Sequence, residues 1–168
     1  GKLFILQTRS GKRTAQAALN VAVDLVEEGL ITKEEAIMRI EPNSLDQLLH
    51  PTFDSEQLKK AQVLSKGLAA SPGAASGKIY FNAADVVEAT KRGEKTILVR
   101  QETSPEDIEG MISAQGILTA RGGMTSHAAV VARGMGKCCV AGASEVIVDE
   151  AQKIVRCKGI TLNEGDVI

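Results

Sequence analysis

The chain has 168 residues, 43% of them apolar, and a formal net charge of −1. At this length we expect one domain, or one domain with an appendage, and a compact chain buries roughly 70% of its unfolded surface, which is enough for a stable core. The near-neutral charge argues against a nucleic-acid-binding face or an acidic tail. With three Phe, one Tyr and no Trp, the chain also lacks the rings that a base-stacking platform needs.

Cysteine usage and hydropathy indicate the cellular compartment in which we expect the protein. Cys138, Cys139 and Cys157 form no Cys-x-x-Cys pair and have no zinc spacing, which predicts a reduced, cytoplasmic chain. We expect the cysteines to pack as small apolar residues, with Cys139 close enough to the candidate site to line it. The sequence has no charged-then-apolar leader and no apolar run of bilayer length, so we expect neither secretion nor membrane spanning.

The first predicted element is a buried strand at residues 3–6, which are all apolar. An isolated apolar strand needs neighbours to pair with. We therefore expect that its sheet is missing and that the chain is a fragment of a longer protein.

The next fifty residues are predicted to be a helical connector rather than a self-contained core. Apolar residues recur at three- and four-residue steps in 14–28, and Gly29 is a good helix stop. Capping boxes at 32–35 and 44–47 predict two further helix starts, and Pro42 is expected to end the first of these helices. The polar stretch 54–67 is predicted to be a linker, helical in part.

The sequence pattern changes at residues 69–73, which contain Pro and Gly and are typical of turns. From there, short apolar runs alternate with capped helical patterns, which predicts an α/β layer structure with a β-rich end. The predicted strands are 78–81, 96–100, 116–119, 138–141, 146–148 and 153–157. The predicted helices are 83–92 behind the cap Asn82, 105–114 behind the cap Ser104, and 126–133 before Gly134 and Gly136.

The chemically informative stretch is R-G-G-M-T-S-H-A-A-V-V-A-R, residues 121–133. Gly122 and Gly123 allow positive φ and a close approach of the backbone to a ligand. Thr125 or Ser126 can cap the following helix, which places His127 in its first turn. Unpaired amides and the positive end of the helix dipole attract phosphate at such a position.

The same helix end acts on the imidazole of His127. A positive field disfavours the imidazolium ion, so we expect a neutral ring whose nitrogen lone pair can attack phosphorus. Once phosphorylated, the ring carries a negative charge that the helix end stabilises. Arg121 and Arg133 are candidate charge partners for the phosphate. Residue types and spacing alone leave open whether the site carries phosphate covalently or only binds it.

The segment G-G-M-T-S-H-A-A-V-V-A-R-G-M-G-K-C-C-V closely resembles the phosphohistidine signature of the pyruvate, phosphate dikinase family. Further stretches agree, so the resemblance covers nearly the whole chain: L-Q-T-R-S-G-K-R-T-A, S-L-D-Q-L-L-H-P-T-F, A-S-P-G-A-A-S-G-K and E-T-S-P-E-D-I-E-G-M. The resemblance implies a swivelling phosphohistidine domain of β/β/α architecture at 68–168, behind a helical linker at 13–67. Residues 1–12 would be the C-terminal edge of an ATP-grasp nucleotide-binding domain.

By the same resemblance, His127 carries the phosphoryl group as tele-phosphohistidine, bonded through Nε2. The family converts ATP, phosphate and pyruvate to AMP, diphosphate and phosphoenolpyruvate through pyrophospho- and phosphohistidine. Gly122, Gly123, Ser126, Arg121 and Arg133 would surround the phosphate. Thr125 matches the threonine that a regulatory kinase/phosphorylase modifies, and Gln7 and Arg9 match the end of the nucleotide site.

The resemblance also implies partners that this chain lacks. These are the ATP-grasp domain and a pyruvate/phosphoenolpyruvate-binding barrel of the same polypeptide, with Mg²⁺ bound by those domains and none by this fragment. The fragment should not turn over alone, and the full enzyme should be a homodimer.

Two other functions stay open. One is a carrier domain of phosphoenolpyruvate synthase or of phosphotransferase-system enzyme I, against which Met124 and the adjacent Cys138 and Cys139 argue. The other is a non-enzymatic module that binds anions at the glycine turn. We interpret His50, beside a proline in the connector, as structural.

Overall fold

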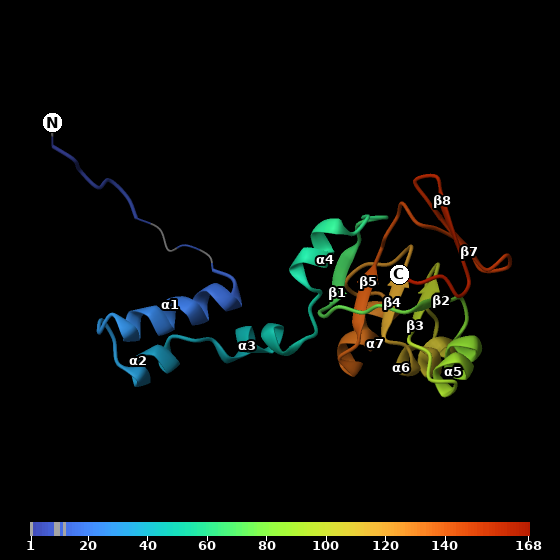
Figure 1. Cartoon of the computed structure of the whole chain (residues 1–168), viewed down its shortest axis with the longest axis horizontal. Coiled ribbons are helices and arrows are strands. Elements are labelled where there is room, and N and C mark those ends of the chain that lie inside the picture. Colours follow the sequence, from blue (N-terminus) through green and yellow to red (C-terminus); the bar gives the residue numbers. More distant parts are fainter. Residues whose placement is uncertain (1, 9–10, 12) are drawn as a thin grey trace. The chain divides into compact units, whose positions relative to one another are not determined.

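The computed structural model describes residues 2–8, 11 and 13–168, and the chain divides into two units, Gly1–Leu49 and His50–Ile168 (Figure 1). In the first unit the helices are α1 (Ala15–Glu27), α2 (Lys33–Met38) and α3 (Pro42–Leu49). In the second unit the helices are α4 (Ser55–Lys60), α5 (Ala83–Lys91), the 3-10 turn η1 (Pro105–Asp107), α6 (Ile108–Ser113) and α7 (His127–Met135). The strands are β1 (Leu68–Ser71), β2 (Lys78–Tyr80), β3 (Thr96–Arg100), β4 (Gly116–Thr119), β5 (Cys138–Ala141), β6 (Ile147–Asp149), β7 (Ile154–Cys157) and β8 (Ile160–Asn163).

Local caps determine where the helices of the first unit begin. Thr14 caps α1, and Thr32 forms the predicted capping box with Glu35 at the start of α2. The second predicted capping box is wrong, because α3 already begins at Pro42 and the Ser44 hydroxyl donates to the Glu41 carbonyl (2.7 Å). Proline fits the first turn of a helix, where its missing N–H would have no partner. Pro42 therefore begins a helix as well as following one.

The predicted strand at residues 3–6 is not formed. These residues adopt no regular structure, and their side chains are exposed, from 73% for Phe4 to 95% for Leu3. A strand needs a hydrogen-bonding neighbour, and the described part of the first unit supplies only helices and connections. Within the described residues of that unit, the buried hydrophobic side chains are Ala15 and Ala22.

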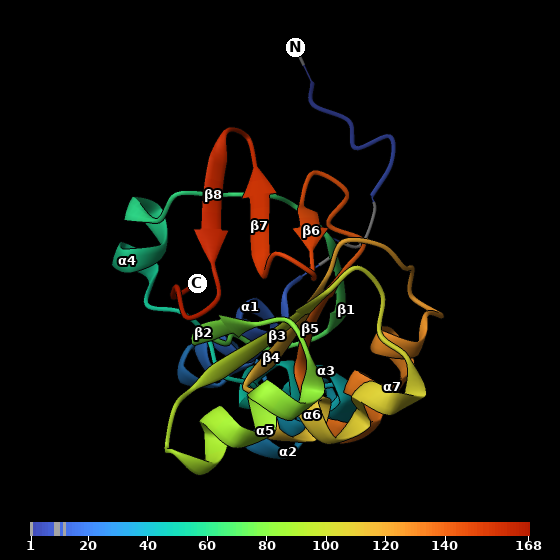
Figure 2. The same ribbon diagram turned by 90° about the vertical axis from the view of Figure 1, so that its right-hand side faces the viewer.

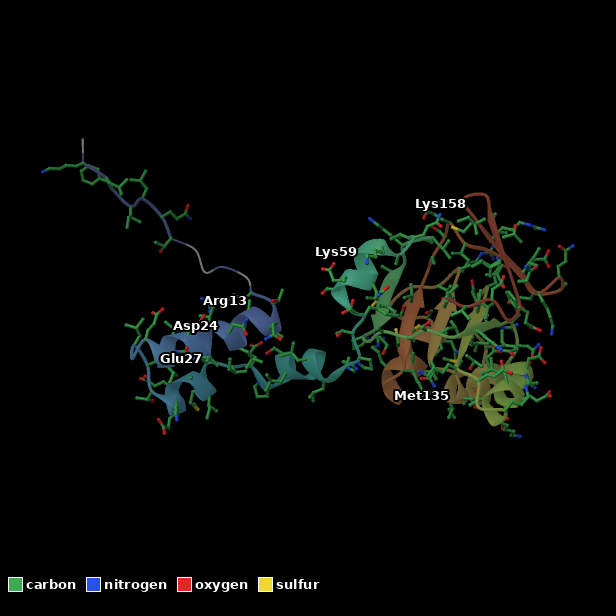
Figure 3. The ribbon with its side chains drawn as sticks, in the orientation of Figure 1. Arg13, Asp24, Glu27, Lys59, Met135 and Lys158 are labelled. Carbon is green, nitrogen blue, oxygen red and sulfur yellow. The ribbon has the colours of Figure 1, made fainter. Side chains whose placement is uncertain are left out.

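The second unit has three layers (Figure 2). A five-stranded sheet has the order β1-β5-β4-β3-β2, in which β2 to β5 are parallel and β1 runs antiparallel to β5. Helices α5, α6 and α7 connect successive parallel strands and cover one face. The antiparallel sheet β6-β7-β8 covers the other face. In Figure 3, Met135 of the helical layer and Lys158 of the small sheet lie on opposite sides of the unit.

Period-two alternation along the central strands separates the two cores. Leu98 and Ile117 face the helices, where they pack with Met111 and the alanines of α7. The neighbouring Ile97 and Val99 face the small sheet and pack with its valines. Because successive strand residues point to opposite faces, one run of apolar residues supplies both cores.

Two strands lie outside the sequence prediction. β1 falls in the stretch predicted to be a turn, and its register shifts between Ala69 and Ser71. β8 pairs with β7 across the two-residue turn Lys158 and Gly159, whose φ values are +50° and +80°. Positive φ at both turn residues suits the twist of a hairpin, so Gly159 was the available signal for β8.

The edges of the large sheet are both blunted. At β2, residues 165–168 run alongside the strand, and Gly77 and Ile168 exchange two main-chain hydrogen bonds of 3.0 Å. At the opposite edge, β1 is only four residues long, contains a register shift and is followed by Pro72.

No helix among the described residues is long and apolar enough to cross a membrane.

Candidate functional site

His127 lies in the first turn of its helix, as predicted, and is the first residue of α7. Of the two predicted caps, Ser126 is the residue that caps the helix. The Ser126 hydroxyl accepts from the Ala129 amide (3.4 Å), and its φ and ψ are extended. A helix leaves its first amides without intrahelical partners, and their positive end is a favourable place for an anion. The His127 ring is half-buried, so it is positioned by its surroundings and still reachable.

The loop before α7 depends on two glycines. Gly122 has φ +108°, and a Cβ atom there would lie 2.9 Å from the Ser126 side chain. Gly142, with φ +66°, approaches so closely that a Cβ atom would lie 2.5 Å from the Gly122 carbonyl oxygen. Gly123 has open space around it, so only the first of the predicted glycine pair is needed by packing. The backbone after β5 therefore closes one side of the loop.

Buried Thr119, at the end of β4, holds the beginning of this loop. Its hydroxyl donates to the Arg121 carbonyl (2.7 Å), and its own carbonyl accepts from the Ala143 amide (3.0 Å). With a fully buried side chain, Thr119 has little freedom to move. The loop is thus anchored at its start by Thr119 and at its end by the Ser126 cap.

The imidazole has a partner that the sequence prediction missed. Thr103 Oγ1 lies 2.9 Å from His127 Nδ1. Thr103 follows β3 and His127 follows β4, and these are neighbouring parallel strands. Ligands of open α/β sheets bind at the carboxyl ends of such strands, so the position of Thr103 just after a predicted strand was a usable signal. With Nδ1 engaged, Nε2 is the ring nitrogen that remains for chemistry.

A charged network supports the loop that carries Thr103. Arg100, the last residue of β3, pairs with Glu150 (2.6 Å) and with Asp107 (3.4 Å). Glu150 also accepts from the Gln101 amide (3.0 Å), and Asp107 accepts from the Ser104 amide (2.8 Å). The Asp107 carboxylate is almost completely buried, and a buried charge needs such partners.

The predicted phosphate partners have different surroundings. The Arg133 guanidinium donates to the Met124 carbonyl (2.6 Å), so it holds the glycine loop against α7. Arg121 and Thr125 are exposed residues of the same loop. Gln7 is exposed in the first unit, and Arg9 lies outside the described residues. The loop and α7 therefore bring together Arg121, Gly122, Gly123, Ser126, His127 and Arg133.

Cys139 packs as a small apolar residue, as predicted, and does not line the site. Its side chain is fully buried and packs with Ala128, Ala129 and Ala132 behind α7. Burial, with a smaller contribution from neighbouring Cys138, raises the pKa of the Cys139 thiol to about 11. A thiol of that pKa is a poor nucleophile at neutral pH, so Cys139 acts as a small apolar side chain.

Among the residues that the structure describes, no group of three or more His, Cys, Asp or Glu side chains is arranged to hold a metal ion.

Comparison with known proteins shows which families the chain is similar to. Residues 92–168, which include Thr103, the glycine loop and His127, match the family described as PEP-utilising enzyme, mobile domain.

The whole chain is, in addition, similar to pyruvate, phosphate dikinases. It is 62% identical over 168 residues to the enzyme of Clostridium symbiosum, and this covers 100% of the chain and 19% of the relative. The identity is 61% over 168 residues, or 100% of the chain and 18% of the relative, for Rhizobium meliloti (strain 1021). For Entamoeba histolytica it is 56% over 167 residues, 99% of the chain and 18% of the relative. The chain thus spans about a fifth of the length of these relatives.

Proposed function

We propose that the chain is the phosphoryl-carrying part of a pyruvate, phosphate dikinase and that His127 carries the phosphoryl group on Nε2. One observation carries this proposal. The ring stands at the start of α7 with Nδ1 2.9 Å from Thr103 Oγ1, so Nε2 is the free nitrogen. The similarity of the whole chain to dikinases supports the choice of reaction.

In the proposed first step, the Nε2 lone pair attacks the β-phosphorus of ATP. The bond between this phosphorus and the oxygen that bridges it to the α-phosphorus breaks, and AMP leaves with the electron pair. Inorganic phosphate then takes the outer phosphoryl group as diphosphate, and the enolate oxygen of pyruvate takes the remaining one to form phosphoenolpyruvate. Such steps depend on positioning and on stabilisation of negative charge.

The local residues have separate roles in this scheme. The amides at the start of α7 face the transferred phosphate, and Arg121 is exposed in the same loop and available to pair with it. Arg133, the other proposed phosphate partner, also holds the loop through the Met124 carbonyl. If Nδ1–H donates to Thr103, the same bond persists after phosphorylation at Nε2, so the ring does not need to reorient between steps.

We propose the following organisation for the whole protein. Residues 1–12, including Gln7 and Arg9, end an ATP-grasp domain, 13–67 form a linker, and 68–168 form a domain that swivels between the nucleotide site and a pyruvate-binding barrel. Mg²⁺ binds to those other domains, the enzyme is a cytoplasmic homodimer, and this chain alone does not turn over. A regulatory kinase/phosphorylase acts on exposed Thr125, where a phosphate would repel the incoming nucleotide.

The test uses the intact polypeptide that contains this chain. ATP labelled at the β-phosphorus should give an acid-labile, alkali-stable label, which inorganic phosphate and pyruvate together remove as phosphoenolpyruvate. His127→Ala should abolish the label, and His50→Ala, which changes the other histidine of this chain, should keep it. Full labelling of the His127→Ala protein would refute the proposal.

A second measurement separates the dikinase reaction from that of related carriers. With ATP labelled at the γ-phosphorus, release of labelled diphosphate should require inorganic phosphate as the acceptor. With ATP labelled at the β-phosphorus, labelled phosphoenolpyruvate formed at the same rate without inorganic phosphate would exclude a dikinase.

A further inference from the structure

We propose that Glu150 is a positioning residue for His127, which it reaches through Arg100 and the loop 101–104 that carries Thr103. The inference rests on the proposed function, because it concerns the readiness of His127 Nε2 to attack. Glu150 lies in the connection between β6 and β7, so this role assigns the small sheet a part in the chemistry besides covering the core.

The first contacts are those of Glu150 itself. One carboxylate oxygen accepts from the Gln101 amide (3.0 Å), and the other accepts from the Arg100 guanidinium (2.6 Å). The same Arg100 nitrogen donates to the Phe81 carbonyl (2.9 Å), which fixes the guanidinium against the end of β2. Glu150 thus joins the small sheet to the first residue of the loop.

Asp107 holds the other end of the loop, and its ion pair with Arg100 Nε is longer and has no hydrogen bond. Asp107 accepts from the Ser104 amide (2.8 Å) and pairs with Arg100 Nε (3.4 Å). One guanidinium therefore pairs with two carboxylates, and these carboxylates bind the amides at the two ends of the four-residue loop 101–104. Exposed side-chain fractions of 20% for Arg100, 35% for Glu150 and 6% for Asp107 limit screening by solvent.

This arrangement controls the ring through Thr103. The hydroxyl can accept from Nδ1–H only while the loop holds it at 2.9 Å, and that bond favours the tautomer with the lone pair on Nε2. If Glu150 is removed, the Gln101 amide loses its acceptor and Arg100 loses one of its two carboxylates. Thr103 is then less firmly held, and the preference for this tautomer falls.

The ring tautomer is measured on the neutral imidazole of the ¹⁵N-labelled chain with long-range ¹H–¹⁵N correlation spectra. In the wild type, the Nδ1–H tautomer of His127 should dominate. Thr103→Val should reduce the tautomer ratio about fivefold, the factor that corresponds to one hydrogen bond of about 1 kcal/mol. Glu150→Ala should shift the ratio in the same direction by a smaller factor, and Glu150→Gln, which keeps one amide acceptor, by a still smaller one.

Two controls distinguish positioning from a general loss of structure. Glu145→Ala removes another ion pair of the same region, Glu145 with Lys158 (3.0 Å), and should leave the ratio unchanged. In the Thr103→Val background, Glu150→Ala should have no further effect, because both changes act through the same contact. If Glu150→Ala does not fold, the tautomer ratio of Glu150→Gln tests the inference.

A wild-type ratio in both Glu150 variants would overturn the inference. So would an equal shift in Glu145→Ala, or an undiminished effect of Glu150→Ala without the Thr103 hydroxyl. The spectra require no phosphoryl transfer, so this outcome is independent of the labelling of His127. A shifted tautomer ratio in the Glu150 variants, together with an unlabelled His127 in the transfer experiment, would refute the proposed function and support the positioning role.

Discussion

Replacing Gly142 by alanine tests whether the backbone after β5 shapes the His127 loop. An alanine at φ +66° lies in the left-handed region, which costs about 1–2 kcal/mol. Its Cβ atom would also lie 2.5 Å from the Gly122 carbonyl oxygen, a backbone atom held between Thr119 and the Ser126 cap. We add about 1–3 kcal/mol for the forced displacement, so the free energy of unfolding should fall by about 2–5 kcal/mol.

Gly159→Ala is the matched control, because Gly159 has φ +80° but no atom within 4 Å of the point that a Cβ atom would occupy. It should lose only the conformational part, about 1–2 kcal/mol. Urea unfolding can be followed by the fluorescence of Tyr80, which is the single tyrosine in a chain without tryptophan and belongs to the second unit. Equal losses in the two variants would refute the close contact with Gly122. A shift of the His127 ring resonances in Gly142→Ala alone would place its effect at the site.

Three further predictions concern pH, thiol reactivity and packing. Hydrogen bonds, the largest from Lys78, lower the pKa of Glu94 to about 2, so its stabilising contribution is present above pH 4.5 and is lost as the pH falls towards 2. The stability difference between wild type and Glu94→Gln, measured by urea unfolding, should shrink across that range; a constant difference would contradict it. In native protein, mass spectrometry after alkylation should find half-buried Cys138 modified before fully buried Cys139, and the reverse order would contradict the described burial. Met111→Ala, at a fully buried position, should destabilise the second unit by about 2–5 kcal/mol, and a loss below about 1 kcal/mol would show that α6 packs loosely.

Local signals predicted most of the parallel sheet and its helices. Strands 96–100, 116–119 and 138–141 have the predicted bounds, because each is a short apolar run between turn residues. The helix behind His127 extends to Met135 rather than ending before Gly134, since the left-handed cap is Gly136. Because two glycines lie near the end of this helix, the sequence does not show which one ends it. The left-handed conformation of Gly136 in the structure does.

Elements that depend on distant partners were harder to predict. The strand predicted at 3–6 is exposed coil, because an apolar run predicts a strand without supplying its neighbour. β1 pairs with β5, which lies about seventy residues later in the sequence. The small residues of β1 are typical of a turn, so its sequence does not indicate a strand. The contact of Thr103 with His127 joins two loops that only the strand order brings together. Caps and periodicity are properties of neighbouring residues, whereas this contact depends on topology.

The blunted sheet edges have a consequence for the proposed carrier function, in which the domain would dock with more than one partner. Open main-chain donors and acceptors on an edge strand pair readily with any extended segment they meet. Here residues 165–168 occupy those groups along β2, while brevity, a register shift and Pro72 make β1 a poor template. In the proposed carrier, side chains around the imidazole would therefore make the contacts with each partner, and the domain would dissociate without breaking an intermolecular β-ladder.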